Sequence, residues 1–343
     1  MPFVSSPSDD NVVPCWIDST ATPTNPSLIF PIISARTDKT LHYAQGADVS
    51  TARAAVDSSW TAFQSWKKTS HVTRRNLLLK VADIYEKRID ELVDYQTTET
   101  SCDEAWAKSN VARTVVILRE IAAAISHVKG EIPCIEDDDV TAFVFKEPIG
   151  PFLCIPPWNA ALILSTRAIA GAIGAGCTVL LKASELCPRT HHAIVEAFEE
   201  AGCPKGVLNQ IQCRREDAGP VTEAVIAHAG IRKIEFIGSD TVGRIIGAVA
   251  AKYLKPTMME LGGKCPAIVL EDADVETAAR MCGMAGTFIT SVKAGFVLTQ
   301  QFPLLSIPPS WPNMLLYRTH HSPALDRRKV PIRPRRLHRK MVQ

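Results

Sequence analysis

The sequence has no long hydrophobic run, and this absence limits where the protein works. No uninterrupted apolar stretch approaches the roughly 18 residues that a membrane-spanning helix needs. The first residues, MPFVSSPSDD, lack the basic start and the apolar core of a secretory signal. Hydrophobic residues make up 46% of the chain and charged residues 22%, which is typical of a globular protein. We therefore expect a cytoplasmic protein with no membrane partner.

Paired cysteine motifs are also missing. The ten cysteines stand singly, with no CxxC and none of the Cys/His spacings of a zinc site. We expect no bound metal, and we expect most thiols to be small core residues in a reducing compartment. No thiol follows Cys282, so the remainder of the chain offers no cysteine nucleophile.

Acidic residues are scarce near the C-terminal end. Residues 292–343 hold ten Lys or Arg and one acid, Asp326, so the preceding part of the chain is net acidic. The same stretch contains seven prolines and no sustained hydrophobic period. We assign it no packed element, because neither helices nor strands tolerate that pattern.

Hydrophobic periodicity is clear in the rest of the chain. Residues 26–47 read as a small β-rich region, and apolar residues spaced three and four apart after Val49 predict three or more amphipathic helices. Beyond Pro133, short apolar strands alternate with helices. The predicted strands are AFVFKEPIG, GPFLCIPPW, CTVLLKAS, VLNQIQC, KIEFIG, PTMMELGG and KCPAIVL. Strands that are apolar on both sides indicate an α/β fold with a Rossmann-like, doubly wound parallel sheet.

The helices between these strands also have expected positions. We place them at residues 163–176 and 189–201, near Val221, from Thr241, and from Asp274 to about Met284. Asp272 and Asp274 are well placed to cap the last of these helices.

Four motifs end predicted strands. No GxGxxG follows a strand, so the common dinucleotide fingerprint is missing. In its place stand PPWNAAL at 156–162, KASE at 182–185, FIGS at 236–239 and ELGGK at 260–264. Because the carboxyl ends of parallel strands share one sheet edge, where open α/β sheets bind ligands, we expect the four motifs to lie together there.

Each motif also has a plainer interpretation. Asn159 is either an amide aimed at an oxyanion or a turn residue that bonds its own backbone. Lys182 and Glu185 are either ligands or an ordinary surface pair, and Ser239 is either a phosphate contact or only a helix N-cap. Glu260, ahead of two glycines, is either a general base or a solvated carboxylate.

In this order and spacing, the four motifs resemble the aldehyde dehydrogenase family. They are most similar to its branch that acts on salicylaldehyde and vanillin, and the resemblance covers roughly residues 20–290. It implies an NAD(P)-binding domain with N-terminal helices, oxidation of an aromatic or otherwise hydrophobic aldehyde to a carboxylic acid, and homo-oligomers. The implied segments are 1–48 (irregular and β-rich), 49–132 (helical part), 133–265 (cofactor-binding core), 266–291 (start of the catalytic domain) and 292–343 (basic tail).

The resemblance also implies residue roles. Asn159 becomes half of an oxyanion hole and Glu260 the general base. Lys182 and Glu185 hold the adenosine ribose, where a carboxylate favours NAD and leaves NADP as the alternative. The implied cofactor-binding residues are Ile155, Pro156, Pro157, Trp158, Lys182, Ser184, Glu185, Phe236, Gly238, Ser239, Val242, Leu261 and Gly262.

The family's nucleophilic cysteine has no counterpart where the resemblance places it, at Ala294. Cys282 falls inside a predicted helix and is no substitute. Read one base later, the codons of WPNMLLYRTHHS permit GQICSSTERII, which is similar to the family's nucleophile motif, and residues 292–310 have the length of a short intron. We interpret 292–343 as a retained intron followed by a frame-shifted exon. As written, the chain is then expected to be inactive, without most of the catalytic domain and the C-terminal oligomerisation strand.

Two alternatives compete with a dehydrogenase. One is a non-catalytic NAD(P)-binding remnant or decoy subunit. The other assigns the basic tail, with RRK and RPRRLHRK, to nucleic-acid or membrane contact. An out-of-frame origin explains that composition without selection for binding, so we expect no nucleic-acid partner.

Overall fold

The main sheet has seven strands in the order β10-β9-β6-β7-β8-β2-β3. A computed structural model describes residues 6–137, 139–263, 266–269, 272–287 and 295–298. Five strands are parallel: β6 (Phe152–Ile155), β7 (Val179–Lys182), β8 (Leu208–Ile211), β9 (Lys233–Gly238) and β10 (Thr257–Leu261). The short β2 (Trp16–Ile17) and β3 (Thr20–Ala21) extend the β8 edge in antiparallel pairing.

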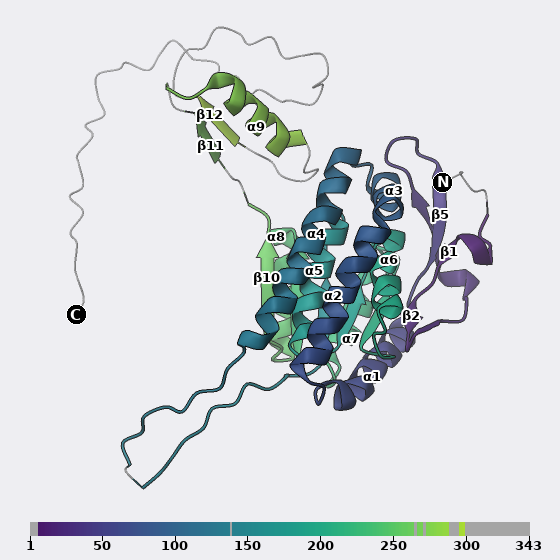
Figure 1. The fold of residues 1–343 in the computed structure, drawn as a ribbon. Helices are drawn as coiled ribbons and strands as arrows, with labels where there is room; N and C mark the ends of the chain where they lie inside the picture. The colour runs from purple at the N-terminus through teal and green to yellow at the C-terminus, as the bar shows by residue number, and fades with distance from the viewer. Residues whose placement is uncertain (1–5, 138, 264–265, 270–271, 288–294, 299–343) are drawn as a thin grey trace, which may run out of the picture. The chain divides into compact units, whose positions relative to one another are not determined.

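Helices cover both faces of this sheet (Figure 1). On one face lie α1 (Val49–Trp66), α7 (Ala218–Ala227) and α8 (Asp240–Lys252). On the other lie α5 (Ala161–Gly174) and α6 (Pro188–Glu200), packed against α2 (His71–Lys87), α3 (Ile89–Thr100) and α4 (Glu104–Ala124). The predicted α/β class and doubly wound parallel sheet are confirmed.

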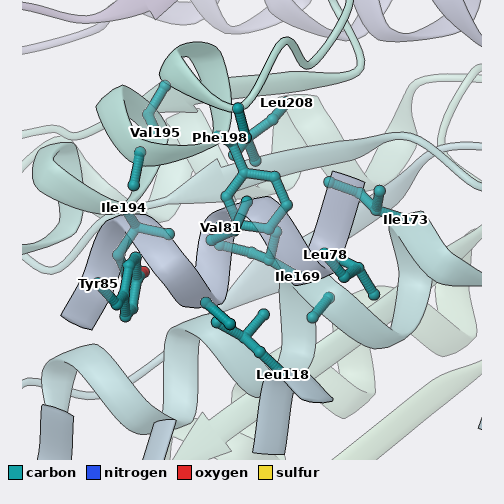
Figure 2. Close-up of a cluster of buried hydrophobic side chains, with 14 of the residues drawn as sticks. Leu78, Val81, Tyr85, Leu118, Ile169, Ile173, Ile194, Val195, Phe198 and Leu208 are labelled. Atoms are coloured by element: carbon teal, nitrogen blue, oxygen red, sulfur yellow. The ribbon is translucent and has the colours of Figure 1, made fainter. Parts of the chain in front are cut away.

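The alternation of strand side chains explains why both faces need cover. Leu180 belongs to the hydrophobic cluster on the α1 side, whereas its neighbour Leu181 belongs to the cluster on the α5 and α6 side. Figure 2 shows part of the second cluster, where Phe198 of α6 lies among side chains of α2 and α5. Burial on both sides of one strand is what its unbroken apolar run predicts.

The N-terminal region forms a second, smaller sheet in the order β1-β5-β4. Its strands are β1 (Val12–Val13), β4 (Ile29–Ile33) and β5 (Thr40–Gln45), and its core contains Ile32, Leu41 and Ala44. The expected β-rich entry region is therefore present. Short 3₁₀ turns lie at η1 (Asp9–Asn11), η2 (Pro26–Leu28) and η3 (Ile125–His127).

Two predictions of local structure are wrong. The run AFVFKEPIG is not a strand: its one ladder contact is an isolated antiparallel bridge between Glu131 and Val144. Phe143 and Phe145 are 60% and 78% exposed, because this segment has no neighbouring strand in the described part of the chain to bury them. The second error lies in the basic tail, where β12 (Gly295–Leu298) pairs in parallel with β11 (Pro266–Val269). Four apolar residues are enough for a strand but too few for a periodicity.

The last predicted helix is confirmed as α9 (Val275–Thr287), and Asp274 caps it by accepting a hydrogen bond from the Thr277 amide at 3.2 Å. Ala294 and residues 299–343 lie outside the described residues, and with them most of the stretch interpreted as non-native. None of the described helices has the length and apolar character needed to cross a membrane.

Candidate functional site

The strand order creates a point at which the chain changes direction across the sheet. From β6 the chain moves through β7 to β8 on one side, and β9 then returns to pair with β6 on the other. The loops after β6 and β9 therefore leave the same edge of the sheet toward opposite faces. Doubly wound sheets bind ligands at the point where two such loops separate. All four motifs end strands at this edge, as expected.

The loop after β6 carries the predicted oxyanion residue. Asn159 is half-buried, and its Oδ1 accepts a hydrogen bond from the Ala160 amide at 3.0 Å, just before α5 begins. This contact is the local one that the plainer interpretation requires. It turns the carbonyl end of the side chain toward the backbone, so that the amide nitrogen is the end that can serve as an oxyanion donor. Of the preceding residues, Pro156 is buried and Ile155, Pro157 and Trp158 are half-buried.

The loop after β7 holds the predicted ribose ligands. The ladder to β8 continues into it through a 2.8 Å hydrogen bond from the Ala183 amide to the Ile211 carbonyl. Lys182 is 8% exposed, and Ser184 and Glu185 are half-buried. In the described part of the chain, neither Lys182 nor Glu185 has an ion-pair partner. A buried cation and a half-buried carboxylate without ion-pair partners fit the hydroxyls of a ribose.

Cys213, after β8, lies near both predicted ribose ligands, Lys182 and Glu185. Burial raises the pKa of its thiol, Lys182 lowers that pKa, and Glu185 raises it. The shared effect on one thiol places the cation and the carboxylate in the same neighbourhood. It also brings the end of β8 beside the KASE loop.

The FIGS turn after β9 has the features of a phosphate site. Ser239 is the N-cap of α8, and its Oγ accepts a hydrogen bond from the Val242 amide at 3.3 Å. A Cβ on Gly238 would lie 2.6 Å from the ring of Phe236, which is 4% exposed and belongs to the core, so only glycine fits this turn. An exposed helix N-terminus beside a glycine turn fits a pyrophosphate, because backbone N–H groups and the helix dipole both favour anions.

Leu261, the last residue of β10, and Gly262, which follows it, lie beside this turn. The Gly262 amide donates to the Gly238 carbonyl at 3.1 Å, and the methyl groups of Leu261 approach Gly243 of α8. Val242 and Leu261 are 43% and 44% exposed, so the turn carries apolar surface suited to a nucleotide base or ring.

Glu260 lies on β10 at the same edge and has a partner that the sequence did not reveal. Its carboxylate is half-exposed and lies 2.8 Å from Nη2 of Arg167, which projects from α5. A second carboxyl group, Glu235 on β9, is buried. Burial raises the pKa of Glu235, Arg167 and Lys233 lower it, and Glu260 raises it again. The Arg167 guanidinium thus interacts with the carboxyl groups of both Glu260 and Glu235. No local motif predicts this arrangement, because the three residues come from three elements.

Burial keeps three of the described thiols near this edge from ionising readily. Burial raises the pKa of Cys154 and Cys187 well above the ordinary value, and the pKa of Cys213 is also raised. A nucleophilic cysteine needs the opposite shift, because the thiolate is the reactive form. Cys282 lies within α9, as predicted. Within the described residues, no cluster of His, Cys, Asp or Glu has the arrangement of a metal site.

Comparison with known proteins identifies the family: the model for the aldehyde dehydrogenase family matches residues 22–291, and the chain belongs to this family. Among curated relatives, a salicylaldehyde dehydrogenase of Pseudomonas sp. (strain C18) is 35% identical over 274 residues, and a vanillin dehydrogenase of Pseudomonas fluorescens is 36% identical over 276. Each alignment covers 80% of this chain but 56% and 57% of the relative, so the chain spans little more than half their length.

Solved structures give the same result. The salicylaldehyde dehydrogenase of Pseudomonas putida G7, complexed with salicylaldehyde, superposes with a TM-score of 0.78 at 33% identity, covering 80% of this chain and 57% of that one. An NAD-dependent benzaldehyde dehydrogenase from Corynebacterium glutamicum superposes with a TM-score of 0.76 at 27% identity, covering 80% and 60%.

Proposed function

We propose that this chain carries the cofactor half of an NAD(P)+-dependent dehydrogenase that oxidises an aromatic or hydrophobic aldehyde to its carboxylic acid. The observation that carries the proposal is that four motifs lie together at the carboxyl-terminal edge of the parallel sheet. Each motif has side chains suited to a different part of a dinucleotide. The matched relatives, which act on salicylaldehyde, vanillin and benzaldehyde by name, support the aromatic substrate class.

Each motif has a share in holding the cofactor. Lys182 and Glu185 bind the adenosine ribose, and the α8 N-terminus with Ser239 binds the pyrophosphate. The remaining proposed contacts are Ile155, Pro156, Pro157, Trp158, Ser184, Phe236, Gly238, Val242, Leu261 and Gly262. A nicotinamide ring held here supplies the hydride acceptor. The Glu185 carboxylate accepts hydrogen bonds from a free 2′-hydroxyl and repels a 2′-phosphate, which favours NAD+.

Two side chains act on the aldehyde and its products. The Asn159 amide donates a hydrogen bond to the oxygen that gains negative charge when the aldehyde carbon is attacked. Glu260 removes a proton from the attacking group, and Arg167 fixes where its carboxylate lies before that step. Attack itself needs a nucleophilic thiolate, and the sequence has Ala294 where the resemblance places that cysteine.

Binding and turnover test the proposal separately. Calorimetric titration of the full chain with NAD+ and NADP+ is expected to show saturable binding, tighter for NAD+. Glu260→Gln is expected to leave that binding unchanged, whereas Lys182→Met weakens it. Oxidation of salicylaldehyde, vanillin and benzaldehyde is then measured through the formation of reduced cofactor. Absence of dinucleotide binding by the unaltered chain contradicts the proposal.

The raised pKa values of the described thiols favour a second candidate, a protein that binds the dinucleotide without oxidising an aldehyde. Burial raises the pKa of Cys154, Cys187 and Cys213, which disfavours the thiolate form of each. Saturable NAD+ binding with no turnover of any aldehyde supports this candidate, and turnover of one contradicts it.

A further inference from the structure

A histidine on α6 contacts the KASE loop from inside the protein. His191 is fully buried, and its Nδ1 accepts a hydrogen bond from the Ser184 amide at 3.1 Å. Ser184 is the residue before Glu185, the proposed ribose carboxylate. An acceptor at Nδ1 requires that this nitrogen carry no proton, so the ring is in the tautomer with the proton on Nε2.

The same ring also reaches the start of α5, just beyond the loop after β6. His191 also forms a hydrogen bond with the backbone of Ala161, two residues beyond Asn159, and its Nε2 lies 3.9 Å from the Cys187 thiol. Burial lowers its pKa to about 4, so the ring stays neutral and keeps its acceptor near neutral pH. One side chain therefore joins the loop after β7 to the start of α5.

We propose that His191 is a positioning residue for the cofactor: it fixes the backbone of the KASE loop and thereby the place of the Glu185 carboxylate. The inference rests on the proposed function, because it assigns a role toward the same dinucleotide. The alternative, that His191 only fills the core, predicts no link between its Nδ1 acceptor and nucleotide affinity.

The neighbouring residue supplies a matched control. His192 lies on the same helix, is 5% exposed and also has a pKa lowered by burial. Its ring packs edge-on against Trp16 at 5.3 Å, and its Nε2 lies 3.8 Å from Glu196. Changing His192 therefore perturbs the same helix without removing the contact to Ser184.

The experiment compares three variants of the full chain. Asn at position 191 places an acceptor near the position of Nδ1, whereas Gln extends past it, so H191N keeps the contact and H191Q loses it. We expect H191Q to bind NAD+ and AMP about tenfold more weakly than the unaltered chain, the value of one lost neutral hydrogen bond. H191N and H192Q are expected to bind both nucleotides with affinities within about twofold of the unaltered chain, because neither loses the hydrogen bond to Ser184.

Equal affinity of H191Q and H192Q for both nucleotides overturns the inference but leaves the proposed function standing. Failure of the unaltered chain to bind either nucleotide overturns both. Amide hydrogen exchange provides a test that needs no variant: the Ser184 amide of the unaltered chain is expected to be protected. Exchange there at the rate of an unstructured peptide also overturns the inference.

Discussion

Replacing Glu99 is expected to destabilise the fold strongly, because this one carboxylate caps helix α6 from another part of the chain. It lies near the end of α3, has a side chain that is 2% exposed, and accepts hydrogen bonds from the amides of Arg189 and Thr190 at 2.9 and 2.7 Å. The Thr190 hydroxyl donates to it at 2.6 Å, and His42 Nε2 lies 2.8 Å away. The N-cap residue of α6, Cys187, provides no side-chain cap of its own.

The size of the effect follows from the donors that would be left without a partner. Glu99→Ala leaves two amides, a hydroxyl and an imidazole without a hydrogen-bond partner in the interior. Each unpaired buried group costs about 1–3 kcal/mol. Some of these groups gain water in the space that the side chain vacates, so we expect a total loss of about 3–5 kcal/mol, toward the low end of the sum for four unpaired groups. Glu99→Gln keeps one acceptor oxygen and is expected to lose about half as much.

Urea denaturation followed by circular dichroism measures these changes. The control is Glu104→Gln, which removes an exposed ion pair with Lys108 at the start of α4 and is expected to leave the midpoint unchanged. If Glu99→Ala and the control have the same midpoint, the carboxylate is not the cap of α6 and the reasoning fails.

Three further results are expected. Because burial lowers the pKa of His191 from 6.5 to about 4, the unfolded chain takes up a proton before the folded one; stability is therefore full above pH 6.5 and falls by about 1.4 kcal/mol per unit toward pH 4. Urea midpoints at pH 7 and 5 measure this fall, which should be smaller in H191N. Glu185→Gln should strengthen NADP+ binding about fivefold relative to NAD+, since roughly 1 kcal/mol of repulsion is removed; an unchanged calorimetric ratio contradicts its place at the ribose. Gly176→Ala should cost about 1–3 kcal/mol, because φ is +87° and a Cβ would lie 1.9 Å from Arg74, whereas Gly219→Ala, in open space on α7, should not destabilise in the same thermal melts.

The parts of the structure that the sequence predicted are those governed by local pattern. Strands such as 179–182 are apolar on both faces, and their alternation with helices was enough to place the four motifs at one edge. The same reasoning failed for Phe143 and Phe145, since an apolar run does not show whether a partner strand exists. The two-residue strands β2 and β3 are too short to leave any periodicity.

The site residues that the sequence missed depend on long-range contacts. Arg167 and Glu235 lie on different elements from the predicted Glu260, and Glu99, away from the site, caps a helix that starts 89 residues later in the chain. One signal was available for Glu99: α6 begins with Pro188 after a cysteine that cannot cap it well. A helix start with no local cap implies an acceptor elsewhere, although it does not say which one.

The strand order also has a consequence for biosynthesis. A ribosome releases β6, β7 and β8 before β9, so the side with the proposed adenosine contacts can assemble while β9, which carries the proposed pyrophosphate turn, is still being made. Until β9 emerges and pairs with β6, one long edge of the central strand stays open in the nascent chain. Contacts made early by the α5 and α6 layer, including His191 with Ser184, would then hold the half-built sheet in register while the rest is translated.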